Sequence, residues 1–255
     1  MCSSDLESGS SVSVTFTRGA NTVTKTVTGN GATAVAVVLT STDLTTLGNG
    51  TISVSATATD AAGNASTAGS GSFTLDTVAP TVSTVAITSA TGIQNSTLNA
   101  GDVVSVTVTM SEAVNVTGTP RVTLNVGGTN KTANYSSGSG TASLVFTYTI
   151  ASGDTDANGI SIAANSLALN SGTIADLAGN AATITHSAVA DNASYLVDTT
   201  APATPTVTLG TGVSDGATST EATQAGGVVT VTAESGRSEE HTSELQSPCN
   251  LVCRL

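Results

Sequence analysis

The stretch VVSVTVT (residues 103–109) alternates valine with serine or threonine from Val104 onward. In an extended chain, successive side chains point to opposite faces, so Val104, Val106 and Val108 share one face and the hydroxyl side chains share the other. A strand with one apolar and one polar face covers a core on one side and meets water on the other. Valine and threonine are also better strand formers than helix formers.

The same alternation recurs along the chain, and turns rich in Gly and Asn separate the segments that carry it: SVSVTFT (11–17), TISVSATAT (51–59) and SLVFTYTI (143–150). Many short alternating strands at close spacing are typical of antiparallel β-sandwiches. We therefore predict an all-β chain of antiparallel β-sandwiches in tandem.

The two ends of the chain differ in chemistry from everything between them. RSEEHTSELQS (237–247) gathers charged residues and is followed by PCNLVCRL (248–255). Back-translated, RSEEHTSELQS resembles a common sequencing-library adapter, and MCSSDL (1–6) resembles the reverse complement of the same adapter. We therefore expect 1–6 and 237–255 to be adapter-like scars, and we set them aside when predicting fold and function.

Once the ends are set aside, the composition excludes several function classes. All three cysteines lie in the ends, so no disulfide framework or cysteine metal motif is expected in residues 7–236. These residues carry fourteen acidic and four basic side chains, a net charge of −10. So few basic residues argue against nucleic acid or an anionic membrane surface as a partner. No apolar run is long enough to insert into a membrane.

Two pairs of repeated motifs predict the domain boundaries. LDTVAP (75–80) returns as VDTTAP (197–202), and DAAGN (60–64) returns as DLAGN (176–180). Proline cannot donate to a strand ladder, so each Ala-Pro is expected to end a strand and to begin a stiff linker. We predict one sandwich domain at 80–202, preceded by a domain at 7–79.

The tripeptide ESG also occurs twice, at 7–9 before SSVSVTFT and at 234–236 after GVVTVTA. Joined head to tail, the two stretches would form a pair of consecutive strands. We therefore expect that the chain covers one period of a longer repeat. On this hypothesis the domain at 7–79 lacks its first strands, and residues 203–236 are the first strands of the next domain.

These segments resemble a known class of bacterial repeat. GNGTISVSATATDAAGNASTAGSGSFTLDTVAP (48–80) resembles the Ig-like repeats of giant secreted adhesins, including biofilm-associated proteins of Gram-negative bacteria. GDVVSVTVTMSEAVNVTGTPRVTLNVGG (101–128), through to VDTTAP, is similar to a longer Ig- or cadherin-like repeat of such proteins. The resemblance implies Ig-like sandwiches in an extracellular, cell-surface stalk that is exported by type I secretion and serves cell adhesion. Neighbouring repeats of the same chain would be its partners, and calcium would stiffen its domains and linkers.

Calcium is the ligand that the residues themselves favour, because Ca²⁺ takes oxygen ligands from Asp, Asn and backbone carbonyls. The resemblance points to two turn acids and two linker acids. GDTDANG (153–159) has the spacing of the first half of a calcium loop, but its twelfth position is Asn165, where a calcium loop has Glu. The candidate ligands are Asp60, Asp76, Asp102, Asp154, Asp156, Asn158, Asp176 and Asp198. The alternative is that these Asp and Asn side chains only form turns.

The sequence argues against an enzyme. GVSDG (212–216) fits a nucleophile motif formally, with Ser214 at its centre, but the strand and helix that this motif needs are not evident. The expected function is a non-enzymatic structural stalk repeat of a bacterial adhesin. A surface module that binds carbohydrate, protein or ice is the alternative, because alternating threonines on a flat face can order a ligand or water.

Overall fold

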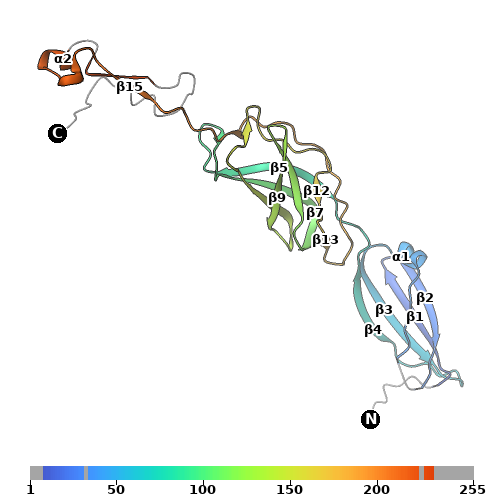
Figure 1. Ribbon diagram of the computed structural model, residues 1–255. Coiled ribbons are helices and arrows are strands. Elements are labelled where there is room, and N and C mark those ends of the chain that lie inside the picture. Colours follow the sequence, from blue (N-terminus) through green and yellow to red (C-terminus); the bar gives the residue numbers. More distant parts are fainter. Residues whose placement is uncertain (1–7, 32–33, 224–226, 233–255) are drawn as a thin grey trace. The chain divides into compact units, whose positions relative to one another are not determined.

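The computed structural model describes residues 8–31, 34–223 and 227–232, which form two compact units divided after Asp198 (Figure 1). The adapter-like ends predicted at 1–6 and 237–255 lie outside the described residues. Antiparallel sheets dominate both units, so the all-β prediction is confirmed.

Residues 8–79 form one antiparallel sheet with the strand order β2-β1-β3-β4. Its strands are β1 (Ser11–Arg18), β2 (Asn21–Thr28), β3 (Gly50–Thr59) and β4 (Gly69–Leu75). Val12, Val14 and Phe16 of β1 are buried, and their hydroxyl neighbours face away, as the alternation predicts. Ile52 of β3 is fully buried beside them.

A short helix, α1 (Ser41–Leu47), packs on this sheet and was not predicted from the sequence. Thr40 and Asp43 form a capping box, in which each side chain accepts a hydrogen bond from the backbone N–H of the other residue. Leu47 at the end of the helix is fully buried in the core below the sheet. The Thr-Ser-Thr-Asp sequence before an apolar residue is therefore the signal that marks this helix.

Residues 80–198 form a sandwich of two sheets that share one core. The larger sheet has the order β12-β8-β9-β10-β7-β13, with β5 also paired to β7, and the smaller has the order β11-β14-β6. Only the β14–β6 pair is parallel. The strands are β5 (Val82–Thr91), β6 (Thr97–Leu98), β7 (Val103–Thr117), β8 (Arg121–Val126), β9 (Thr129–Ser137), β10 (Thr141–Thr149), β11 (Thr155–Asp156), β12 (Leu167–Ala168), β13 (Thr173–Asp176) and β14 (Leu196–Asp198).

Strand β7 is the centre of this domain. Its Val104, Val106 and Val108 have no exposed surface, which confirms the inward face predicted from VVSVTVT. Leu144 and Phe146 of the neighbouring β10 are equally buried. Because the described residues contain no cysteine, this core is held by packed aliphatic and aromatic side chains without a covalent link.

The second unit contains a two-stranded antiparallel hairpin of β15 (Thr206–Leu209) and β16 (Val229–Thr232). Between these strands lie a 3-10 turn, η1 (Val213–Asp215), and a short helix, α2 (Ser219–Thr223).

Candidate functional site

The Asp-x-x-Gly-Asn turn that begins at Asp176, the last residue of β13, fixes the carboxylate of this acid. The backbone N–H of Asn180 donates to Asp176 Oδ1 at 2.8 Å, and Asn180 Nδ2 donates to Asp176 Oδ2 at 2.7 Å. Gly179 takes a positive φ of 96°, which closes the Asp-x-x-Gly-Asn turn. The equivalent turn at Asp60 and Asn64 has the same two hydrogen bonds, at 2.7 and 2.8 Å. The sequence repeat is therefore also a structural repeat.

The linker acid Asp76 comes directly after β4. Its Oδ1 accepts hydrogen bonds from the backbone N–H of Val78 at 3.1 Å and from Asn49 Nδ2 at 3.3 Å. Its backbone carbonyl accepts from Asn180 Nδ2 at 3.2 Å. Asp76 is thus held by Asn49, which directly precedes β3, and by Asn180 from the following domain.

The rest of the linker is tied to the following domain by backbone hydrogen bonds. The N–H of Thr183 donates to the carbonyl of Pro80 at 2.8 Å. Thr81 donates its N–H to Ser111 Oγ at 3.0 Å, and its carbonyl accepts from the N–H of Ser111 at 2.8 Å. Because Ser111 precedes Glu112 on β7, these bonds bring Glu112 close to the linker.

Three carboxylates meet at this junction. Each of Asp76, Glu112 and Asp176 has a carboxylate oxygen, and these oxygens all lie within 4.8 Å of one another. Oxygens that bind one Ca²⁺ at 2.3–2.6 Å are at most about 5 Å apart, so this spacing fits a shared calcium ion. Among the described residues, no other three acidic, His or Cys side chains come together in this way.

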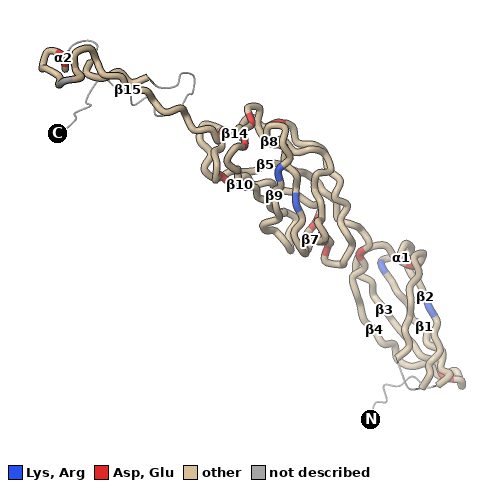
Figure 2. The backbone as a smooth tube through the Cα atoms, in the orientation of Figure 1, with Lys and Arg blue, Asp and Glu red and all other residues tan. Residues whose placement is uncertain are grey.

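Acidic residues lie at this junction (Figure 2), and the three carboxylates bring their negative charges close together. Burial raises the pKa of Asp176, but the hydrogen bonds from Asn180, Gly179 and Ala178 outweigh it and hold this pKa below its ordinary value. Asp176 therefore stays ionised at neutral pH, although its side chain is buried. In the described ranges, the salt bridges are Lys25–Asp43 and Lys131–Asp154, and neither reaches the three carboxylates. A cation at this site would relieve their mutual repulsion.

The predicted acid Asp154 has a different environment. Its Oδ1 lies 2.5 Å from Lys131 Nζ, and its Oδ2 accepts hydrogen bonds from the Tyr148 hydroxyl at 2.5 Å and the Ala151 N–H at 3.0 Å. Burial and the hydrogen bond to this carboxylate raise the pKa of Tyr148 to about 12. Asp154 therefore already has a cation and two hydrogen-bond donors around it.

Asp156 and Asn158 also have partners within the fold. Asp156 Oδ2 accepts from the N–H of Gly127 at 2.8 Å, and its Oδ1 accepts from the N–H groups of Asn158 and Gly159 at 3.2 and 2.8 Å. The Asn158 side chain donates to Asp191 at 2.5 Å. These contacts stabilise the turn after β11, and calcium ligation by Asp154, Asp156 and Asn158 stays a prediction.

The remaining three candidates lie apart from the junction. Asp60 is exposed in its turn, and Asp102 accepts a hydrogen bond from the Asn99 N–H at 2.8 Å. Asp198 ends β14, opposite Thr155. Within the described part of the chain, none of the three joins a cluster of three metal-ligating side chains.

The sequence reasoning missed Glu112. This residue lies in the middle of β7, without the Gly or Asn that marks the turn acids. The signal that could have found it is that Glu112 is the one acidic residue in this long strand.

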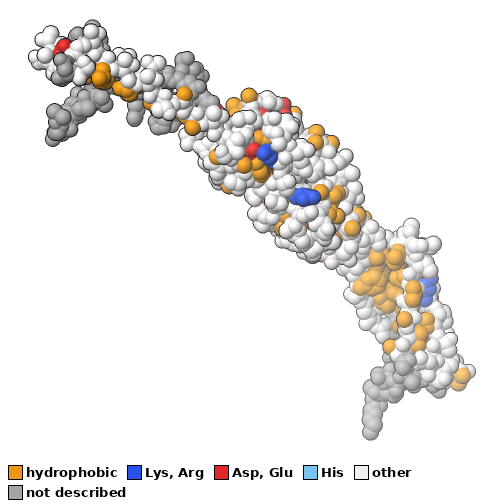
Figure 3. All heavy atoms as spheres, in the orientation of Figure 1, with side chains coloured by type: hydrophobic (Ala, Val, Ile, Leu, Met, Phe, Trp, Pro, Cys, Tyr) orange, Lys and Arg blue, Asp and Glu red, His pale blue; other side chains and the backbone are white. Residues whose placement is uncertain are grey.

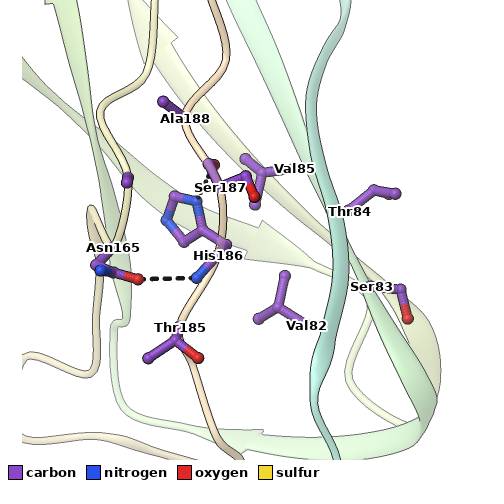
Figure 4. Close-up of a pocket in the computed structure, with 10 residues that line it drawn as sticks. Val82, Ser83, Thr84, Val85, Asn165, Thr185, His186, Ser187 and Ala188 are labelled. Carbon is purple, nitrogen blue, oxygen red and sulfur yellow. Dashed lines mark hydrogen bonds between the residues drawn. The ribbon is translucent and has the colours of Figure 1, made fainter.

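A hollow between β5, residues 164–165 and residues 185–188 contains His186 (Figure 4). The His186 Nε2 accepts from the backbone N–H groups of Ser166 and Leu167 at 2.9 and 3.2 Å, and Nδ1 lies 2.8 Å from the Ser187 carbonyl. Both ring nitrogens are therefore used inside the protein, and the ring orders the backbone around it.

No helix in the described residues has the length and apolar character needed to cross a membrane. No protein-family model matches the chain, and no curated protein matches it.

Two solved structures are similar to the chain. One is the tetra-tandem repeat in the extending region of a large adhesion protein, with 23% identity over 80% of this chain and 46% of that chain, and a TM-score of 0.30. Another comes from work on host cell surface retention of a 1.5-MDa bacterial ice-binding adhesin, with 20% identity, 79% and 58% coverage, and a TM-score of 0.35. This chain spans about half the length of the structures it matches.

Proposed function

We propose that this chain is a non-enzymatic structural repeat in the extracellular stalk of a bacterial cell-surface adhesin, and that Ca²⁺ stiffens the junction around Asp76. The observation that carries this proposal is the cluster of Asp76, Glu112 and Asp176. One acid comes from the linker, one from β7 and one from the last position of β13. An ion bound by all three would fasten the linker to the domain that follows it.

The chemistry of the cluster suits a weak extracellular calcium site. Three carboxylates, the backbone carbonyls nearby and water can supply the oxygens that Ca²⁺ needs. Extracellular modules typically bind calcium with Kd values of about 10⁻⁴–10⁻³ M, which matches the calcium available outside cells. Such a site would be filled after export, when the stalk has to hold its shape.

The arrangement of the possible catalytic side chains supports a structural role. Ser214 lies in the 3-10 turn η1, and this turn is not the strand-to-helix elbow that a serine nucleophile uses. Both ring nitrogens of His186 are bonded to backbone groups, so the ring is positioned as a structural element. A stalk repeat needs neither residue for chemistry.

The test is thermal unfolding of the full chain in about 5 mM Ca²⁺ and in EDTA. Asp176→Asn and Glu112→Gln each remove one charge from the cluster. Asp60→Asn is the matched control, because Asp60 lies in an equivalent turn but, among the described residues, joins no cluster of three acids. For a Kd near ~10⁻⁴ M, calcium binding to the folded state stabilises by about 2 kcal/mol, or roughly 5 °C in the midpoint. We expect this rise for the wild type and for Asp60→Asn, and its loss in the two cluster variants.

Two results would contradict the calcium proposal. One is the same midpoint with calcium and with EDTA in the wild type. The other is a calcium response that persists in both cluster variants but disappears in Asp154→Asn, which would move the site to the GDTDANG loop.

A second candidate function is ligand binding on the hydroxyl face of the first sheet. Six side chains line an open hollow there: Thr15, Thr17, Ser53, Ser55, Ser70 and Ser72. Binding of carbohydrate or ice to this face would be lost when Thr15 and Ser55 are changed to Asp. Glycan-array binding and ice-recrystallisation inhibition measure the two activities directly.

A further inference from the structure

The sheet of residues 8–79 leaves part of its apolar face open to solvent. Val12, Val14 and Phe16 on this face are at most 7% exposed, because the 34–40 segment and α1 cover them. Phe73 of β4 pairs with Ile52 and so lies on the same face, yet it is 40% exposed. It contacts Phe16 edge to face, with ring centroids 6.4 Å apart. Figure 3 shows hydrophobic side chains gathered on the surface of this domain.

Residues 34–39 cover the other part of the face, and among the described residues they pair with no strand. Residues 34–39 alternate between exposed and half-buried positions, and Val37 and Leu39 pack against the core. This is the burial pattern of a strand, but within the described part of the chain residues 34–39 belong to no ladder. Unpaired backbone groups along such an edge are a template for another strand.

The hairpin of β15 and β16 presents the complementary surface. Val207 pairs with Val231, and Leu209 pairs with Val229, so these four side chains share one face. They are 61%, 50%, 60% and 37% exposed, respectively. The threonines of the hairpin share the opposite face. A two-stranded hairpin is marginal by itself and becomes stable when its apolar face packs on another layer.

The sequence indicates which layer this is. The tripeptide ESG follows β16 at 234–236 and precedes β1 at 7–9. The hairpin and the 8–79 sheet therefore share a flanking sequence, which favours this sheet as the layer on which the hairpin packs. The open sheet and the unpacked hairpin belong to different units of the chain. A contact between two copies would bury the exposed apolar side chains of both.

We propose that the β15–β16 hairpin of one copy docks on the 8–79 domain of a second copy. Val207, Leu209, Val229 and Val231 cover the open face around Phe73, and an edge of the hairpin pairs with residues 34–39. Because the two surfaces differ, the contact is heterologous, and each copy keeps one free hairpin and one free sheet. Repetition gives head-to-tail oligomers.

The test is the mass of the full chain by sedimentation velocity over a wide range of concentrations, under reducing conditions that exclude disulfide links through Cys2, Cys249 and Cys253. We expect whole multiples of the monomer that increase with concentration. The double variant Val207→Thr, Val231→Thr removes apolar surface while retaining β-branched residues, and it should weaken association at least tenfold. The matched control is Thr208→Ala, Thr230→Ala on the opposite face, which should assemble as the wild type does.

A mixing experiment distinguishes this specific contact from non-specific aggregation. Phe73→Ser disables the sheet and leaves the hairpin intact, whereas the Val207→Thr, Val231→Thr variant has an intact sheet. At concentrations where each variant alone is monomeric, their mixture should form a 1:1 dimer through the one intact pair of surfaces and should grow no further. Monomers at every concentration of the wild type, or a mixture that forms no dimer or grows beyond it, would overturn the proposal.

Discussion

The sequence motif assigns the Asp154 carboxylate to calcium, but in the fold its oxygens already have partners within the protein. Its spacing to Asp156 and Asn158 resembles a calcium loop, but Lys131 of β9 and Tyr148 of β10 surround its oxygens. Neither partner could be foreseen from the loop sequence, because the pairing of β9 with β10 brings them there. A charge pair of this kind stabilises the fold only while the carboxylate is ionised.

This environment predicts a pH dependence. Burial raises the pKa of Asp154, but the hydrogen bonds from Lys131, Tyr148 and Ala151 outweigh it, and the pKa in the folded state lies below its ordinary value. The contribution of Asp154 is therefore fully present above about pH 4, the pKa in the unfolded chain, and is lost as the pH falls through the folded value.

The change to make is Asp154→Asn, which we expect to cost about 2 kcal/mol at pH 7, because Lys131 and the Tyr148 hydroxyl lose a charged partner. Urea unfolding at a series of pH values from 7 down to about 2 measures the difference between the variant and the wild type. The difference should shrink as the pH falls below 4. A difference that stays constant with pH would mean that the charge of Asp154 is not what stabilises the fold.

At the scale of elements, the two-residue turn between β8 and β9 depends on two glycines with different surroundings. Gly127 and Gly128 have φ values of 55° and 83°, as a type I′ hairpin turn requires. A Cβ on Gly127 would lie 1.9 Å from the Thr155 carbonyl oxygen, whereas a Cβ on Gly128 would meet nothing within 4 Å. The turn of this hairpin is therefore packed against β11 on one side only.

We expect Gly128→Ala to cost about 1 kcal/mol, because alanine is strained at positive φ. Gly127→Ala carries the same strain and also forces β11 away from the hairpin, so it should cost at least about 2 kcal/mol more. Chemical unfolding of the two variants measures both values. Equal losses would show that the backbone around Thr155 moves aside easily.

The strands were predictable from the sequence, because a sheet with one buried and one exposed face requires apolar and polar residues to alternate. This alternation can be read from a few neighbouring residues. VVSVTVT and SVSVTFT both became strands with the predicted faces inward. The helix α1 was missed because its capping box lies among residues that otherwise favour strands. The acid cluster could be predicted only in part: turn and linker motifs mark Asp76 and Asp176, whereas Glu112 reaches them through the hydrogen bonds of Ser111 with Thr81.

At the scale of the molecule, the Asp76 junction connects the 8–79 sheet to the 80–198 domain through hydrogen bonds of Asp76 with Asn49 and Asn180. Without an ion, three carboxylates repel one another, and hydrogen bonds alone hold the linker, among them Asn180 to the Asp76 carbonyl and the pair between Thr81 and Ser111. An ion that binds all three adds a link between the linker and the 80–198 domain. Calcium should therefore narrow the range of distances between the two domains without changing either fold.

Pulsed spin-label distance measurement tests this expectation. Spin labels at Thr26→Cys on β2 and Ser136→Cys on β9, in a chain whose own cysteines are replaced by serine, report one distance across the junction. We expect a broad distribution in EDTA and a narrower one in about 5 mM Ca²⁺. Glu112→Gln and Asp176→Asn should keep the distribution broad in calcium, and Asp60→Asn should narrow as the wild type does. If calcium raises the melting midpoint but leaves the width of the distance distribution unchanged, the ion stabilises one domain and does not stiffen the junction.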